Sequence, residues 1–163
     1  MHRLLAEWWT QPPWESETTV YMDLGKTREE EAVRLYEHTT GRETQEVGFC
    51  TTDDGQIGCS PDRLVGDEGL LEVKCPLPST QVGYLLHGEL PTEYTLQVQG
   101  QLYVTGRAWC DFLSYFPGLP PLLLRVRPEP TVQAALKKQL DIFCADLAFN
   151  KIRLRALAGK ETS

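Results

Sequence analysis

The sequence predicts a single α/β domain built on a mixed, mainly antiparallel sheet that is flanked by helices. Between residues 46 and 127, short runs that alternate apolar and polar residues are separated by clusters of Gly, Pro and Asp, as is typical of strands and turns. Before, between and after these runs, apolar residues recur at helical spacing. The chain of 163 residues suits one domain, and it contains no internal repeat.

Composition and charge narrow the class of protein. No apolar run is long enough to span a bilayer, and the first residues lack the apolar stretch of a signal peptide, so we predict a cytoplasmic protein that does not act at a membrane. The net charge of −7 argues against diffuse coating of DNA, although it permits a local grip by clustered basic side chains. Five cysteines without a C-x-x-C pair predict free thiols rather than disulfides or a zinc site.

The first nine residues are predicted to be helical. Leu4, Leu5, Trp8 and Trp9 recur at helical spacing, which favours a core-facing stripe. A platform on which nucleic-acid bases stack is the alternative.

A second helix is predicted from Gly25 to His38. Glu29, Val33 and Tyr36 fall on one face, so we expect the Glu29 carboxylate to point towards core residues. A carboxylate in that position needs a partner, which a metal ion or a metal-bound water would supply. The alternative is a glutamate that interacts with the helix dipole.

A strand is predicted over residues 46–52, followed by a turn. Asp53 and Asp54 are carboxylates of the kind that bind metals, but Asp-Asp-Gly is a common turn composition. We therefore assign both residues to the turn.

Residues 57–76 are predicted to form a β-hairpin. Residues two apart in a strand share a face, which puts Ser60 with Asp62 on one strand and Glu72 with Lys74 on the other. Asp62 and Glu72 are hard oxygen ligands of the kind that Mg²⁺ or Mn²⁺ prefers. Lys74 would orient or deprotonate an attacking water, or stabilise negative charge. The alternative is a cross-strand ion pair on a solvated face.

Two helices follow, over residues 80–87 and 91–103. On the longer one, Gln97 and Gln101 lie one turn apart and can donate their amides to a phosphate or to a water beside a metal. A glutamine pair alone usually belongs to a helix surface. We expect Gly100 to let this helix approach the sheet closely.

The last elements are strands over residues 108–116 and 122–127 and a helix from Thr131. Arg125 and Arg127 share one side of their strand, which predicts either a basic edge for a DNA backbone or a solvated edge. The final helix carries an apolar stripe that we expect to pack across the sheet. The stripe consists of Val132, Leu136, Leu140, Phe143 and Leu147.

Four motifs, in their order and spacing, resemble the lambda-type phage exonucleases, the YqaJ-like viral recombinase family of the PD-(D/E)xK nuclease superfamily. They are Gly25-Lys-Thr-Arg-Glu29, Cys59-Ser-Pro-Asp-Arg-Leu64, Gly69-Leu-Leu-Glu-Val-Lys-Cys-Pro76 and Leu96-Gln-Val-Gln-Gly-Gln101. The resemblance implies a restriction-endonuclease-like core and hydrolysis of DNA phosphodiesters with one or two Mg²⁺ ions.

The same resemblance implies roles for individual residues. The implied metal ligands are Asp62, Glu72, the backbone carbonyl of Val73, and Glu29. Lys74 would position the attacking water and Gln97 would orient water or phosphate. Ser60 and Gln101 would contact the DNA or its phosphate, Ser60 at a 5′ phosphate.

The resemblance further implies a 5′-to-3′ exonuclease that degrades one strand of linear double-stranded DNA. It implies a homotrimeric ring and a single-strand annealing protein as partner, in phage or prophage recombination inside a bacterial cell. We divide the nuclease domain into an N-terminal helical remnant (1–16), the sheet and catalytic core (46–127) and the C-terminal helix (131–158). Two alternatives stay open: a PD-(D/E)xK endonuclease or repair nuclease, and a truncated, non-catalytic DNA-binding prophage remnant.

Family members carry an N-terminal segment with a Trp-rich motif that helps to bind the 5′ end of DNA. In this chain, Leu4-Leu-Ala-Glu7 already aligns with family residues on the C-terminal side of that segment. We therefore expect this chain to lack it.

Overall fold

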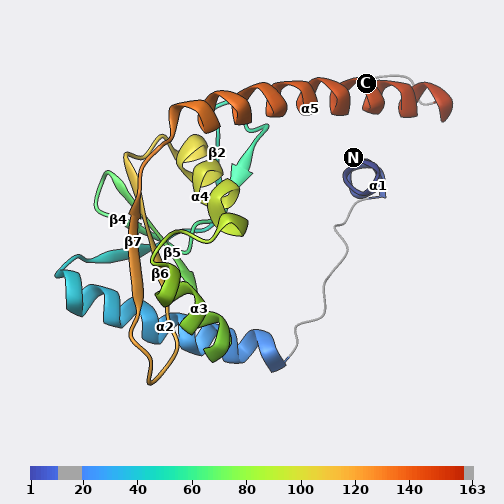
Figure 1. Ribbon diagram of the computed structural model, residues 1–163. Coiled ribbons are helices and arrows are strands. Elements are labelled where there is room, and N and C mark those ends of the chain that lie inside the picture. Colours follow the sequence, from blue (N-terminus) through green and yellow to red (C-terminus); the bar gives the residue numbers. More distant parts are fainter. Residues whose placement is uncertain (11–19, 160–163) are drawn as a thin grey trace. The chain divides into compact units, whose positions relative to one another are not determined.

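The structure of the chain is a computed structural model that describes residues 1–10 and 20–159 (Figure 1). Residues 11–16 of the predicted N-terminal region lie outside this described part. The chain forms two compact units, one of Thr19–Gln133 and one of Met1–Thr18 with Ala134–Ser163. The helices are α1 (His2–Thr10), α2 (Val20–Thr40), α3 (Pro78–His87), α4 (Thr92–Thr105) and α5 (Pro130–Leu157).

The larger unit contains a five-stranded sheet of order β1-β4-β5-β6-β7 and a separate two-stranded ribbon, β2-β3. The strands are β1 (Thr44–Glu46), β2 (Cys50–Thr51), β3 (Gly58–Cys59), β4 (Arg63–Val65), β5 (Gly69–Lys74), β6 (Trp109–Ser114) and β7 (Leu122–Val126). Among these described strands, β5 and β6 pair in parallel and the other neighbours pair antiparallel. The predicted fold class, a mixed and mainly antiparallel sheet with flanking helices, is therefore confirmed.

Strand β5 is buried on both faces. Leu71 and Val73 pack in a cluster with Tyr36 of α2, whereas Leu70 packs with apolar residues of α4. Successive side chains of a strand point to opposite faces, so Glu72 shares the α4 side with Leu70. The site on this strand is consequently enclosed by a helix rather than open to solvent.

The predicted strand over residues 46–52 is wrong, because the stretch is divided between β1 and β2, which belong to different sheets. Gly48 lies in the break, and glycine weakens a strand because it has no side chain to pack. The turn after β2 is as predicted. Asp54 Oδ1 accepts hydrogen bonds from Thr52 Oγ1 at 2.6 Å and from the backbone N–H of Gln56 at 3.1 Å.

The first strand of the predicted hairpin is also shorter than expected. It is interrupted between β3 and β4 at Pro61, which cannot donate a hydrogen bond to the ladder. Ser60 and Asp62 therefore lie in a connection and not on a strand. The hairpin itself consists of β4 and β5, whose antiparallel register pairs Arg63 with Leu71.

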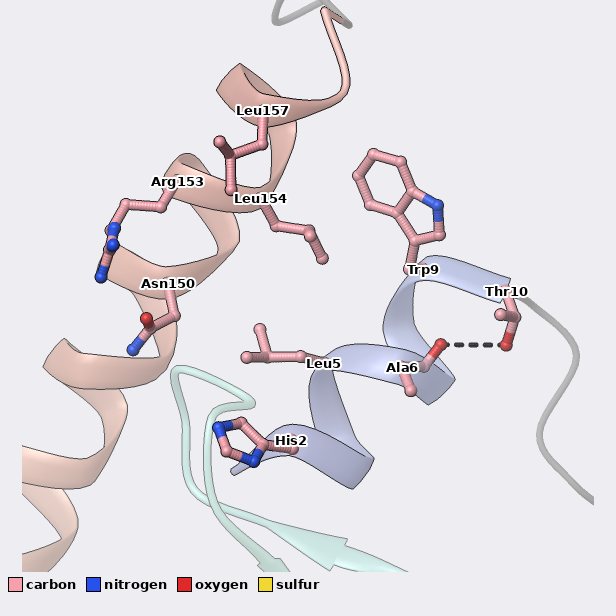
Figure 2. Close-up of a pocket in the computed structure, with 9 residues that line it drawn as sticks. All are labelled: His2, Leu5, Ala6, Trp9, Thr10, Asn150, Arg153, Leu154 and Leu157. Atoms are coloured by element: carbon pink, nitrogen blue, oxygen red, sulfur yellow. Dashed lines mark hydrogen bonds between the residues drawn. The ribbon is translucent and has the colours of Figure 1, made fainter.

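In the smaller unit, α1 and α5 line a pocket of about 520 Å³. Figure 2 shows Leu5 and Trp9 of α1 and Leu154 of α5 among its lining residues. No residue of either helix is buried, and Leu4 is 45% exposed. Within this unit the predicted core-facing stripe of α1 is therefore not buried.

The apolar stripe of α5 takes no part in the two buried clusters of the sheet, and its Phe143 is 37% exposed. Its packing across the sheet stays a prediction. Within the described ranges, no helix combines the length and apolar character that a membrane crossing requires.

Gly69 opens β5 directly opposite Trp109 of β6. A Cβ atom at Gly69 would stand 2.1 Å from the Trp109 ring, which is far inside van der Waals contact. We expect Gly69→Ala to lower the free energy of unfolding by about 1–3 kcal/mol, since overpacking of a core costs that much. Urea denaturation measures the change. Gly48→Ala, where an added Cβ would meet no atom within 4 Å, is the control, and equal stability of the two variants would contradict the expectation.

Candidate active site

The site is centred on the carboxylate of Glu72, in the middle of β5 and only 1% exposed. It accepts hydrogen bonds from Gln97 Nε2 at Oε1 and from Gln101 Nε2 at Oε2, both at 2.6 Å. Lys74 Nζ forms a salt bridge with the same carboxylate. Three donors from β5 and α4 thus compensate a charge that would otherwise be costly to bury.

Asp62 is tied to the same strand from outside the sheet. Its Oδ2 accepts a hydrogen bond of 2.7 Å from the backbone N–H of Val73, the residue between Glu72 and Lys74. Burial and then the charge of Glu72 raise the pKa of Asp62 to about 7, with a smaller contribution from Glu29, although Val73 and Lys74 oppose the shift. The carboxylates of Asp62 and Glu72 therefore act on each other strongly.

Lys74 carries a full positive charge at neutral pH. Burial lowers its pKa, but the attraction and hydrogen bond of Glu72 and the charge of Asp62 outweigh burial and raise the pKa above its ordinary value. Its Nζ also lies 5.1 Å from the centroid of the Tyr94 ring. An ammonium held in this state is suited to orienting water and stabilising negative charge rather than to removing a proton.

The residues present fit a hard divalent cation. Asp62 and Glu72 supply anionic oxygens whose repulsion a cation would relieve, and Mg²⁺ is bound in proteins by one or two carboxylates with water and phosphate completing its shell. Within the described part of the chain, the buried Oε1 of Gln101 is an acceptor without a hydrogen-bond partner. No group of three or more His, Cys, Asp or Glu side chains among those residues is gathered as a metal cluster. The anionic donors that the structure brings together here are therefore the two carboxylates of Asp62 and Glu72.

Glu29 lies near the guanidinium of Arg63, a residue that the sequence reasoning missed. Arg63 is 8% exposed; its Nη1 lies 3.7 Å from Glu29 Oε1 and donates a 2.7 Å hydrogen bond to the backbone carbonyl of Asp62. Its Nη2 forms an ion pair with Glu30 and lies 3.6 Å from Glu46 Oε1. Three consecutive glutamates in the middle of the facing helix α2 were the available signal, since so many carboxylates near a sheet need a buried cation.

Two residues of the sequence motifs, Ser60 and Gln99, lie outside the hydrogen-bond network of Glu72. Ser60 is exposed in the connection before β4 and takes no part in the hydrogen bonds around Glu72. Gln99, on the other side of α4, donates to the Arg127 carbonyl at 2.9 Å and is a scaffold residue. An added Cβ at Gly100 would meet no atom within 4 Å, so the expected close approach of α4 at this glycine is wrong.

The guanidinium of Arg125 is paired with a buried carboxylate. It makes two hydrogen bonds of 2.8 Å to the carboxylate of Asp111, which is 3% exposed, and its guanidinium lies 3.8 Å from the centroid of the Trp109 ring. Tyr36 donates a further hydrogen bond of 2.7 Å to Asp111. Arg125 is nevertheless exposed on the edge strand β7, which agrees with the predicted solvated edge, and its contact with a DNA backbone stays a prediction.

Comparison with known proteins identifies the family of the chain. Residues 5–108 match the YqaJ-like viral recombinase domain. The chain belongs to this family. No match was found among curated proteins.

Solved structures agree with the family. An alkaline exonuclease, LHK-Exo from Laribacter hongkongensis, is 33% identical with a TM-score of 0.86, and the match covers 98% of this chain and 83% of that one. LHK-Exo in complex with dAMP matches with 32% identity and a TM-score of 0.87 over the same shares. A phage related exonuclease from Haemophilus somnus 129PT, 13% identical with a TM-score of 0.62 over 93% of this chain and 81% of that one, shares the fold. Membership of the family confirms the predicted class of the enzyme, a DNA nuclease of the phage recombination type.

The pKa of Asp62 predicts how stability depends on pH without divalent cations. The unfolded side chain ionises near its ordinary pKa of about 3.9, whereas the folded one keeps its proton to about pH 7. The unfolded state therefore binds fewer protons across this range, and the free energy of unfolding falls as pH rises through it. The loss is at most about 1.4 kcal/mol for each unit by which the pKa is raised.

We expect Asp62→Asn to remove this fall, so that the variant is more stable than the wild type at pH 8 in the presence of a chelator. Urea unfolding at pH 5 and pH 8 measures it. Asp67→Asn, in the exposed turn between β4 and β5, should keep the wild-type slope. The same loss of stability in the wild type and Asp62→Asn would contradict this assignment.

Proposed function

We propose that the protein is an Mg²⁺-dependent exonuclease that degrades one strand of linear double-stranded DNA from the 5′ end. The observation that carries the proposal is the buried Glu72 carboxylate, held by Lys74 and two glutamine amides beside Asp62, in a chain of the viral recombinase family. Mn²⁺ is a second metal that such oxygen ligands accept.

Asp62, Glu72 and the backbone carbonyl of Val73 would hold the metal, with Glu29 contributing directly or through water. When bound, the metal would polarise the scissile phosphate and stabilise the leaving oxygen. Arg63 restrains Glu29 in this proposal, because its guanidinium is close to the Glu29 carboxylate and bonded to the Asp62 backbone.

The chain's own groups would orient the reactants. The Lys74 ammonium would position the attacking water and offset the negative charge that develops on the phosphate. Gln97 is the more exposed of the two glutamines and would contact water or phosphate, whereas Gln101 is 3% exposed and would act by fixing Glu72. Ser60 lies at the surface and is proposed as the contact to a 5′ phosphate.

The product class and the cellular role are proposed from the relatives. LHK-Exo has been crystallised with dAMP, and a deoxynucleoside monophosphate is the product that stepwise hydrolysis of a DNA strand releases. By family resemblance we propose a homotrimer that encircles the duplex and works with a single-strand annealing protein, in phage-type recombination in the bacterial cytoplasm.

The decisive test is nucleotide release from linear duplex DNA with Mg²⁺, compared with the same DNA closed into a circle. We expect release from the linear form only, abolished by a chelator, and with strands labelled at their ends the 5′ label should be released first. Lys74→Ala should lower the rate by about 100-fold or more, as loss of one charge-stabilising group typically does. Lys138→Ala, an exposed lysine of α5, is the matched control and should keep the rate.

Cleavage of the circular DNA would show that the protein is an endonuclease and not an exonuclease. Absence of digestion by folded protein with Mg²⁺ would replace it with a DNA-binding protein that does not cut. Equal rates of nucleotide release by Lys74→Ala and Lys138→Ala would show that Lys74 takes no part in the reaction.

A further inference from the structure

A cavity of about 380 Å³ lies where α3 meets the start of α4, away from the hydrogen bonds around Glu72. Thr80, Gly83, Tyr84 and His87 line it from α3. These residues have the spacing i, i+3, i+4, i+7, so one face of the helix forms the wall. The short connection from α3 to α4 and the first two residues of α4 supply the rest of the lining.

The lining is suited to a flat, uncharged group and unsuited to a phosphate. Tyr84, Leu90 and Pro91 supply aromatic and apolar surface, while Glu89 and Glu93 supply carboxylates. The lining residues include no lysine or arginine, so a phosphate would be repelled. A nucleobase offers the complementary chemistry, because its ring stacks on aromatic side chains and its exocyclic amino group donates hydrogen bonds to carboxylates.

The cavity is linked to the catalytic lysine through aromatic rings. Tyr84 donates a hydrogen bond of 2.6 Å to Glu93, and its ring meets Tyr94 edge to face with 6.4 Å between centroids. Lys74 Nζ lies 5.1 Å from the centroid of the same Tyr94 ring. A DNA strand whose phosphate is at Lys74 can therefore reach the cavity with a nearby base.

We propose that this cavity binds a nucleobase of the DNA strand, adjacent to the phosphate that is hydrolysed. Tyr84, oriented by Glu93 and Tyr94, is the stacking surface, and Gly83 leaves the space that the base fills. The inference rests on the proposed function and adds to it a site that holds the strand in place next to the chemistry.

Gly83 allows a test that does not depend on damaging the fold. A Cβ at Gly83 would meet no atom within 4 Å, so a leucine would extend into the cavity without displacing a neighbour. Replacing glycine inside a helix also favours the helix. Gly83→Leu should therefore melt at the wild-type temperature or above it and yet bind the base less well.

The experiment measures DNA binding in a Lys74→Ala background, which prevents digestion. DNA carrying the fluorescent base 2-aminopurine at successive positions from the 5′ end is titrated with protein, and we expect quenching at one position. Gly83→Leu and Tyr84→Leu should remove the quenching and lower affinity by about 5- to 150-fold, as loss of one stacked base does. Val82→Leu, on the same helix but outside the cavity, should retain both.

The outcomes separate this inference from the nuclease proposal. Wild-type digestion of linear DNA, together with quenching that neither Gly83→Leu nor Tyr84→Leu changes, would overturn the base site and leave the nuclease intact. If quenching depends on both residues but the wild-type protein does not digest DNA, the base site is supported and the proposed nuclease activity is refuted. Absence of quenching at every position would also overturn the base site.

Discussion

The carboxylate of Glu72, buried in the central part of the sheet, determines how the neighbouring helix must be placed. Glu72 is 1% exposed, and an unpaired charge in such a place costs several kcal/mol. Lys74 and the amides of Gln97 and Gln101 satisfy it from one strand and one helix. Helix α4 must therefore cover this face of β5 with Gln97 and Gln101 turned towards Glu72, and the same requirement defines the geometry of the candidate active site.

The sequence reasoning predicted correctly which side chains lie together where their placement depends on local spacing. The spacing of Glu72 and Lys74 along a strand, and of Gln97 and Gln101 along a helix, is set by the period of each element. It failed where a charge is balanced by a partner far away in the chain. Arg63 with the glutamates of α2, and Asp111 with Arg125, are set by sheet order and register, which no local pattern contains.

Helix α4 also joins two parts of the larger unit. Gln99 faces away from Glu72, and its side chain donates to the Arg127 carbonyl at 2.9 Å and accepts from the backbone N–H of Glu129 at 2.9 Å and from Gln133 Nε2 at 2.8 Å. Gln97 and Gln101, which donate hydrogen bonds to Glu72, lie on one side of α4. Gln99, which is hydrogen-bonded to the β7–α5 connection, lies on the opposite side. A shift of α4 would therefore disturb the contacts of the Glu72 carboxylate and this connection together.

The parallel pairing of β5 and β6 has a consequence for how the chain folds. Parallel neighbours need a long crossover, and here the crossover is α3 with α4, which carries the amides that Glu72 requires. The carboxylate thus gains its helical partners in the same event that closes the sheet. A chain without this crossover in place would hold an uncompensated charge beside an open strand edge, so we expect the sheet and the candidate site to form together.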